Sequence, residues 1–580
     1  MSSTRNYPAV REWLRDPRNR SFWNEDLVTV KRSELGGLGV YARRDIELDP
    51  DDNESGLLLR IDKEAILSGP NSFISNLLYD SHVDGILALV LALLYEKGQG
   101  KKSPWFEYID SFDFHDLKSH KLIVPPALWS DENRMLLEGT DAELMGVIDP
   151  EDIQSDYTVC LQFAEDNASI VEPPFELSPN TKDPEEENDR KFQLFAAACF
   201  AVTSRSFIID NYQQLALVPA ADLFNHDAYG QEDVHFVAIG RVCPFCGKCD
   251  DCGHDEYGPP DSEAEEYEMG DVESVGEDDG EDNKETNNEE EDTTPLSMSL
   301  IAELDRELDE KKKQEELERA EEESIDGDSE FDASELQLDP DQCCDIVVQK
   351  KVRKGQELMN TYGDLSNALL LSKYGFTVKH NPNDVTCLGR QIIAYRDSEG
   401  KKADERLQWW SSIGFSALEK YKNEIEEEEG SENAEDENPD NEDVEMNDED
   451  DEDDEDDTSC GDDSDSVDDS WLLAASIDFC GDASLDAICV CNLLVMPEKG
   501  FSDLKGADNI EALIKAKMDK KARKLLAELC GDRLACLSGL KSRTFQKYSK
   551  GKLNSQREEA ICTLLEGERD ILEKCITKLG

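Results

Sequence analysis

Two long acidic segments decide which parts of this chain of 580 residues can form a core. Residues 255–335 contain 35 acidic and 6 basic side chains, and residues 424–469 contain 28 acidic and no basic ones. Charges of one sign repel one another, and such segments bury too little apolar surface to offset the entropy lost on ordering. We therefore expect the second segment to be disordered. Residues 300–323 of the first have the composition of a solvated helix with a thin apolar stripe.

The remainder of the chain has an ordinary composition for a globular protein. The acidic segments carry 57 of the 75 net negative charges, which leaves 18 for about 450 residues, enough for two or three domains. The start, MSSTRNYPAV, lacks a secretory signal pattern, and the longest apolar run, residues 86–95, is too short to span a bilayer. We therefore expect a protein of the cytoplasm, the nucleus or both, with reduced cysteines and no membrane partner. We also expect a monomer without a direct nucleic-acid partner.

The hydrophobic pattern alternates between short strands and a long helical stretch. LGGLGVYA and GLLLRID predict a glycine-rich turn and two strands, and residues 76–206 are mainly helical. Strands return in LALVPAADLFNHD and VHFVAIGRV, and CDIVVQKKVRKGQELMNTYG reads as strand, turn and strand. The helical pattern then continues from LSNALLLSKYGF to the end of the chain.

Three motifs, in this order, identify a family. GLGVYA (37–42), DLFNHD (222–227) and ELMNTYGDLSNALLLSKYGF (357–376) together resemble the SET-domain lysine methyltransferases. The branch is typified by the Rubisco large-subunit methyltransferase and the fungal ribosomal-protein lysine methyltransferases. The resemblance implies an α+β fold. It places a β-rich SET domain over residues 1–380, with a helical insertion at about 76–206 and an acidic insert at about 253–340. A helical substrate-binding domain would cover residues 381–580, with its acidic run at 424–470.

The implied reaction is the transfer of a methyl group from S-adenosylmethionine to a lysine amine. Positioning and desolvation carry most of the rate of such a transfer. The amine must be neutral, and an apolar channel lowers its pKa from about 10.4. The resemblance places Tyr362 where the amine meets the methyl group and the cofactor. A tyrosine that packs under a turn is the alternative.

The resemblance also assigns the cofactor residues. Asn225 and His226 would bind S-adenosylmethionine, although an isolated DLFNHD more often forms a capped turn with a hydrogen-bonded histidine. Gly37, Leu38 and Gly39 would let the backbone approach the cofactor, because glycine has no Cβ.

Three further assignments concern the segment VTSRSF and the end of KYGF. Arg205 would meet the cofactor carboxylate, since a planar fork suits a carboxylate. Ser204, Phe207 and Phe376 would line the lysine pocket. A surface arginine and a core phenylalanine are the alternatives. Members of the branch often place an acidic residue before Gly-Leu-Gly, and this chain has Gly36 there.

CPFCGKCDDCGH is a separate feature. It places Cys243, Cys246, Cys249 and Cys252 at three-residue spacing, which suits a tetrahedral zinc site in ligand type. Four ligands within ten residues are closer together than in most zinc knuckles. A structural zinc ion and unligated thiols both remain open.

The predicted function is S-adenosylmethionine-dependent protein-lysine N-methylation, with a ribosomal or other basic protein as the substrate. Some relatives of the same fold methylate histidine, which is the first alternative. A non-catalytic acidic binder or chaperone of basic proteins is the second. The acidic segments either attract such basic partners or are solvated spacers.

Overall fold

The computed structural model describes residues 7–49, 54–112, 114, 122–168, 184–240, 242–244, 246–247, 338–433, 471–507, 510–553 and 555–580. The predicted helix at 300–323 lies outside these residues. The sequence predicts disorder throughout the acidic run at 424–470, but its first part, residues 424–433, continues helix α14 (Phe415–Asn433), and residues 434–470 lie outside the described residues. The described residues before 251 and after 337 belong to a single compact unit.

The main sheet is assembled from three distant parts of the sequence. Its central strands are β4 (Leu57–Asp62) and β10 (Cys343–Val348), which pair antiparallel so that Ile346 faces Leu59. The edge strands are β1 (Ser21–Trp23), which pairs with β4, and β9 (Val234–Ala238), which pairs with β10. The first acidic segment therefore lies in the connection between two neighbouring antiparallel strands.

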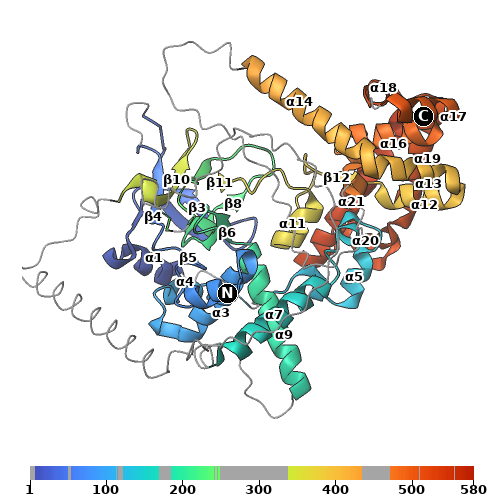
Figure 1. Cartoon of the computed structure of the whole chain (residues 1–580). Helices are drawn as coiled ribbons and strands as arrows, with labels where there is room; N and C mark the ends of the chain where they lie inside the picture. The colour runs from blue at the N-terminus through green and yellow to red at the C-terminus, as the bar shows by residue number, and fades with distance from the viewer. Residues whose placement is uncertain are drawn as a thin grey trace, which may run out of the picture. The chain divides into compact units, whose positions relative to one another are not determined.

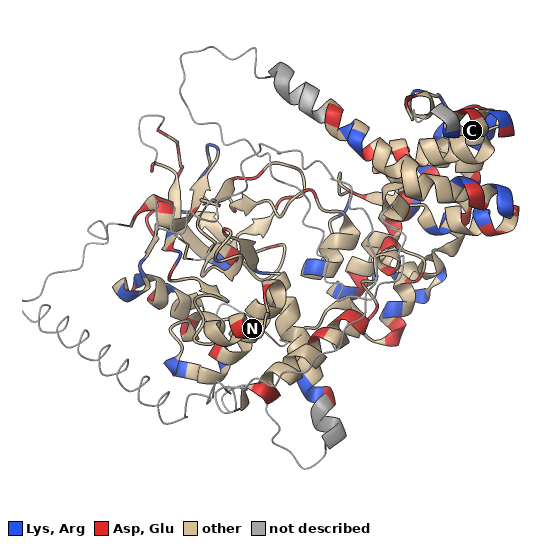
Figure 2. Ribbon diagram, viewed as in Figure 1, with Lys and Arg blue, Asp and Glu red and all other residues tan. Residues whose placement is uncertain are grey.

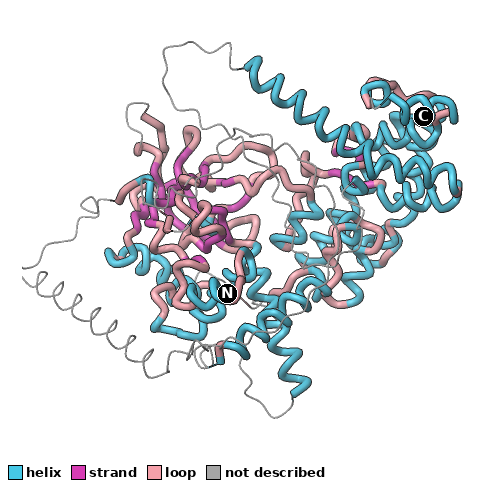
Figure 3. The backbone as a smooth tube through the Cα atoms, viewed as in Figure 1, coloured by secondary structure: helices cyan, strands magenta, loops and turns pink. Residues whose placement is uncertain are grey.

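Short sheets surround the main one (Figure 1, Figure 3). A hairpin joins β2 and β3, a three-stranded sheet has the order β5-β7-β6, and β11 pairs parallel with β8. A last pair, β12 and β13, lies among the C-terminal helices. The strands are β2 (Val28–Arg32), β3 (Leu38–Ala42), β5 (Leu67–Ser68), β6 (Ser206–Ile208), β7 (Leu215–Leu217), β8 (Asn225–His226), β11 (Met359–Asn360), β12 (Val385–Cys387) and β13 (Ser476–Asp478).

Helices occupy the chain between β5 and β6. The most apolar of them, α3, is buried along residues 88–96, because its sequence has no polar face to present to water. None of the helices that the structure describes is both long and apolar enough to cross a membrane. The helices of this part are α2 (Ser75–Asp80), α3 (Gly85–Gln99), α4 (Phe106–Ile109), α5 (Asp131–Leu137), α6 (Asp141–Leu144), α7 (Glu151–Asp166) and α9 (Pro184–Thr203), and α1 (Tyr7–Arg15) precedes the sheet.

The part after β11 is helical and has a hydrophobic core of its own. This core also takes in Leu137 from α5 and Leu371 from α11, so it is not confined to residues beyond 380. Within the described residues its helices are α11 (Asn367–Tyr374), α12 (Gly389–Glu399), α13 (Lys401–Trp409), α14 (Phe415–Asn433), α15 (Trp471–Ala474), α16 (Leu485–Val495), α17 (Glu498–Ala507), α18 (Glu511–Ile514), α19 (Lys520–Cys536), α20 (Arg543–Tyr548) and α21 (Gln556–Leu579).

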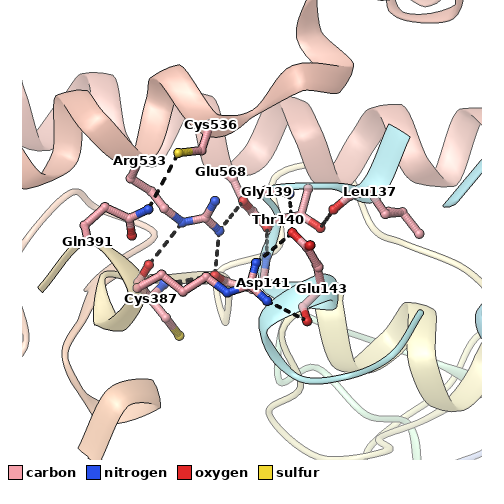
Figure 4. Close-up of polar contacts among 11 residues, drawn as sticks. Leu137, Gly139, Thr140, Asp141, Glu143, Cys387, Gln391, Arg533, Cys536 and Glu568 are labelled. Carbon is pink, nitrogen blue, oxygen red and sulfur yellow. Dashed lines mark hydrogen bonds and ion pairs between the residues drawn. The ribbon is translucent and has the colours of Figure 1, made fainter. Parts of the chain in front are cut away.

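A buried ion-pair network connects the insertion to the C-terminal helices (Figure 4). Arg533 of α19 donates through Nη2 to Asp141 of α6 at 2.7 Å and to Glu568 of α21 at 2.9 Å. The Cys387 backbone joins the same network. Its carbonyl accepts from Arg533 Nε at 3.1 Å, and its N–H donates to Asp141 Oδ2 at 3.0 Å. Burial raises the pKa of Glu568 to about 8. The network fixes four chain segments to one another at the junction.

Candidate active site

A cavity of about 270 Å³ lies where the glycine-rich turn, the insertion and the NTYG segment meet. Its wall combines backbone, one cation and several aromatic rings. It is lined by Tyr7, Val10, Gly36, Gly37, Leu38, Tyr108, Ser111, Ser204, Arg205, Asp222, Leu223, Asn225, Tyr362, Tyr374 and Phe376. Residues from both ends of the SET-like sequence therefore share one cavity.

The turn before β3 provides an open backbone wall. Gly36 and Gly37 have φ values of 123° and 59°, which side chains rarely tolerate. A Cβ added at either position would meet no atom within 4 Å, so the space beside them is free. The absence of side chains thus serves both the turn and a close approach from the cavity.

Gly39 has a different reason to be glycine. A Cβ at this position would lie 2.0 Å from Oε1 of Glu357, and Gly39 is not among the residues that line the cavity. The sequence pattern predicts cofactor contact here. The structure instead fills the missing side-chain position with the Glu357 carboxylate.

Glu357 holds together two walls of the cavity. Its carboxylate accepts hydrogen bonds from Asn225 Nδ2 at 2.7 Å, from the Tyr41 hydroxyl at 2.7 Å and from the Ser33 hydroxyl at 3.0 Å. Asn225 Nδ2 also donates to the Leu38 carbonyl at 3.0 Å. The glycine turn and strand β8 are therefore joined through one carboxylate.

His226 positions the backbone of the NTYG segment. Strand β8 pairs with β11 so that His226 faces Asn360, and the Tyr362 N–H donates to His226 Nδ1 at 2.9 Å. Burial lowers the pKa of His226. Because Nδ1 accepts the Tyr362 N–H, the proton of the neutral ring is on Nε2. The His226 side chain is 7% exposed and is not part of the cavity wall. Its visible role is to hold Tyr362.

Tyr362 is stacked between two other rings. Its ring lies 4.9 Å from His226 and 4.6 Å from Tyr374, centroid to centroid. The hydroxyl donates to the Phe224 carbonyl at 2.9 Å. Burial raises the pKa of Tyr362 above its usual value, so the phenol keeps its proton. Because this proton is used by Phe224, the oxygen lone pairs remain free to accept.

Arg205 brings the positive charge to the cavity. Its Nη1 forms an ion pair with Asp222 Oδ2 at 2.7 Å, and its guanidinium lies 4.9 Å from the centre of the Phe112 ring. The Asp222 side chain is 5% exposed, whereas that of Arg205 is 32% exposed. Asp222 therefore anchors the guanidinium from behind and leaves donors on its open side.

Of the three remaining residues predicted for the lysine pocket, two line the cavity and one does not. Ser204 lines the cavity at the end of α9, with its hydroxyl donating to the Phe200 carbonyl at 2.7 Å. Phe207 points elsewhere, because it stacks on Phe236 at 4.5 Å and does not reach the wall. Phe376 reaches the cavity beside Tyr374.

Four residues that matter to this geometry were not predicted from the sequence. Asp222 opens the DLFNHD motif, Glu357 opens ELMNTYG, and Tyr374 precedes Phe376 in KYGF, so a motif signal existed for all three. Tyr108, in SPWFEYI, lies in a helix of the insertion and lines the cavity. Its signal was the aromatic motif alone.

The cysteine motif is only partly described. Cys243 and Cys246 form a turn in which the Cys246 N–H donates to the Cys243 carbonyl at 3.3 Å. Cys249 and Cys252 lie outside the described residues. The described part of the chain contains no group of three or more metal-ligating side chains. The zinc site stays a prediction.

Comparison with known proteins gives relatives that match the chain over different lengths. Ribosomal lysine N-methyltransferase 3 of Saccharomyces cerevisiae is 31% identical over 581 residues, which covers 96% of each chain. N-lysine methyltransferase SETD6 of Mus musculus is 27% identical over 243 residues, 40% of this chain and 46% of the mouse protein. A search of family models finds no match.

Solved structures of similar fold cover 99% of the chain. Rubisco LSMT bound to AdoMet superimposes with a TM-score of 0.52 at 13% identity, over 91% of that chain. The SET domain of LSMT bound to lysine and AdoHcy gives a TM-score of 0.51 at 14% identity, also over 91% of that chain. At this identity the likeness concerns the fold, and it confirms the predicted α+β SET architecture.

Proposed function

Because this chain belongs to the SET-domain lysine N-methyltransferases, we propose that it methylates the ε-amine of a lysine in a ribosomal protein. The observation that carries this proposal is the shared cavity. It joins an open glycine backbone and the Arg205 cation to a stack of aromatic rings. One side of it suits a small zwitterionic cofactor and the other suits an alkyl amine.

The cavity fits S-adenosylmethionine, which would supply an activated methyl group on a sulfonium. Gly36 and Gly37 leave room for close backbone contact, and the exposed side of Arg205 can pair with a carboxylate. Both N–H groups of Asn225 Nδ2 are used, by the Leu38 carbonyl and the Glu357 carboxylate, so this amide nitrogen fixes the turn. We infer that Asn225 acts by holding this wall in place and by presenting its backbone.

The residues on the lysine side favour a neutral amine. Tyr374 and Phe376 form an apolar wall, and desolvation between aromatic rings lowers the pKa of an amine. Burial raises the pKa of the Tyr362 hydroxyl, which therefore keeps its own proton. Tyr362 thus cannot accept the proton that the lysine ammonium must lose. It accepts a hydrogen bond from the amine or orients the methyl group with its free lone pairs.

The substrate class rests on the yeast relative and on charge. That relative matches over nearly the whole chain and is called a ribosomal lysine N-methyltransferase. The acidic segments, with 57 of the 75 net negative charges, suit the attraction of basic proteins. We assign substrate binding to the helical part beyond residue 381, and we place the enzyme in the cytoplasm, the nucleus or both.

Methylation of purified proteins tests the function directly. Recombinant protein and labelled S-adenosylmethionine are incubated with ribosomal proteins from cells that lack this enzyme, and the products are mapped by mass spectrometry. Methyl-lysine in one ribosomal protein is the expected result. Methyl-histidine would point to the other reaction of this fold. Cofactor binding without transfer to any protein would favour a non-catalytic binder.

A further inference from the structure

The last helices carry a basic surface that the cavity does not use. Residues 471–580 contain 18 basic and 16 acidic residues, although the whole chain has a net charge of -75. Residues 534–557 contain six basic and no acidic residues. Figure 2 shows the two signs of charge interspersed over the C-terminal helices. The negative charge of the chain is therefore concentrated away from this region of sequence.

Five of these cations form what we call the α20 surface. They lie on α20 or within four residues of its ends. All five side chains are exposed, and none forms an ion pair with any residue in the described ranges. By contrast, Lys524 near the start of α19 is paired with Glu528 at 2.9 Å. The α20 surface consists of Lys541, Arg543, Lys547, Lys550 and Lys552.

This surface lacks the features of a protein interface. Phe545, its largest apolar residue, is 7% exposed and packs into the helical core. No large hydrophobic side chain among the described residues of 534–557 is exposed. Protein interfaces depend on buried aromatic and aliphatic anchors, whereas contact with a nucleic-acid backbone depends on cations and tolerates a polar surface.

The α20 surface is connected to the segment that leaves the cavity. Thr377, which follows the cavity residue Phe376, donates to the Ala560 carbonyl of α21 at 3.1 Å. The Lys379 ammonium lies 5.5 Å from the centre of the Tyr548 ring of α20. A polymer bound along α20 would thus lie next to the segment that follows the lysine side of the cavity.

We propose that the α20 surface binds the phosphate backbone of an RNA that accompanies the protein substrate. That the RNA belongs to the substrate particle rests on the proposed function, whereas the binding itself does not. The net charge of -75 for the whole chain predicts no nucleic-acid partner, because negative charge repels phosphate. Charges act over a Debye length of about 8 Å at physiological ionic strength, so the cations close to a bound phosphate matter more than the net charge of the whole chain.

The test measures binding of a labelled single-stranded RNA of mixed sequence to the intact protein. Fluorescence anisotropy gives the affinity at several salt concentrations. One variant combines Lys547→Gln, Lys550→Gln and Lys552→Gln. The matched control combines three exposed lysines around the start of α19, through Lys517→Gln, Lys520→Gln and Lys521→Gln.

Counterion release sets the expected size of the effect. Each phosphate contact contributes about -0.7 to the slope of log affinity against log salt, so five contacts give about -3.5. Without three of its cations, the α20 variant should have a slope less steep by about 2, and its affinity at low salt should fall at least about tenfold. The control variant should stay within about twofold of the wild type. Both variants should melt at the wild-type temperature.

Three results would overturn the proposal. The first is an equal loss of RNA affinity in the two variants, and the second is the absence of RNA binding by the intact protein. The third is RNA binding only after removal of residues 434–469, which would mean that the acidic run covers the surface. Failure of the proposed function is seen separately. Isolated ribosomal proteins would then remain unmethylated by wild type and α20 variant alike, while the RNA affinities still differ.

Discussion

The contact between Gly39 and Glu357 gives the sharpest structural prediction. In Gly39→Ala, the new methyl group would lie 2.0 Å from Oε1 and 2.9 Å from Cδ of Glu357, and 3.0 Å from Asn225 Nδ2. Ordinary contacts begin near 3.4 Å. The carboxylate must therefore move by more than an ångström, which breaks its bonds to Asn225, Tyr41 and Ser33.

The structure sets the magnitude of each change. Overpacking of this kind costs about 1–3 kcal/mol, and each lost hydrogen bond to a charged group adds up to about 1.5 kcal/mol at a half-buried site. Gly39→Ala should lower the free energy of unfolding by about 3 kcal/mol. Glu357→Ala removes the hydrogen bonds without a clash and should cost about 2 kcal/mol. The double variant should resemble Glu357→Ala, with a coupling energy of about -3 kcal/mol.

Two assays follow this prediction. Urea denaturation gives the free energy of unfolding, and calorimetry gives the affinity for S-adenosylmethionine. Affinity should fall in both single variants, because the Glu357 carboxylate no longer holds Asn225 to Ser33 and Tyr41, and the Asn225–Leu38 hydrogen bond alone joins the glycine turn to the Asn225 side chain. Gly531→Ala is the matched control, since a Cβ there meets no atom within 4 Å and should not destabilise. Additive costs in the double variant would refute the reasoning.

Four further predictions concern other parts of the molecule. Tyr362→Phe should keep cofactor affinity within about threefold yet reduce methyl transfer at least about 100-fold, measured by isothermal calorimetry and by single-turnover assays. Burial raises the pKa of Glu568 from 4.5 to about 8, so Glu568 binds a proton more tightly in the folded chain than in the unfolded chain. Stability is therefore lost as pH rises from 4.5 through 8, and thermal melts of Glu568→Gln should show a flatter profile over this window. Removal of residues 424–469 should lower kcat/KM for a basic protein at low salt, with the deficit shrinking as salt rises and absent for an uncharged peptide. A zinc ion at the cysteine motif should appear in metal analysis as one equivalent that Cys243→Ser with Cys246→Ser removes, and full activity of metal-free protein would mean thiols only.

Local motifs were enough to identify the family and to name seven of the fifteen residues that line the cavity. Gly37, Leu38, Asn225 and Tyr362 stand in short segments whose residue types and spacing are specific when they occur together. The acidic segments could also be found from composition, because a charge run cannot enter a core. These features depend on residues close together in sequence, so no knowledge of the tertiary structure is needed to read them.

Tertiary structure decided which of these residues face the cavity and which support it. Glu357 bonds to Ser33 across 324 positions, and Tyr362 bonds to His226 across 136. Arg533 pairs with Asp141 across 392 positions. A motif fixes the type of a side chain but not its distant partner, because hydrogen-bond partners are chosen by strand register and packing. For that reason the motifs assigned Gly39 and His226 to cofactor binding and Phe207 to the lysine pocket, whereas none of the three lines the cavity of the folded chain.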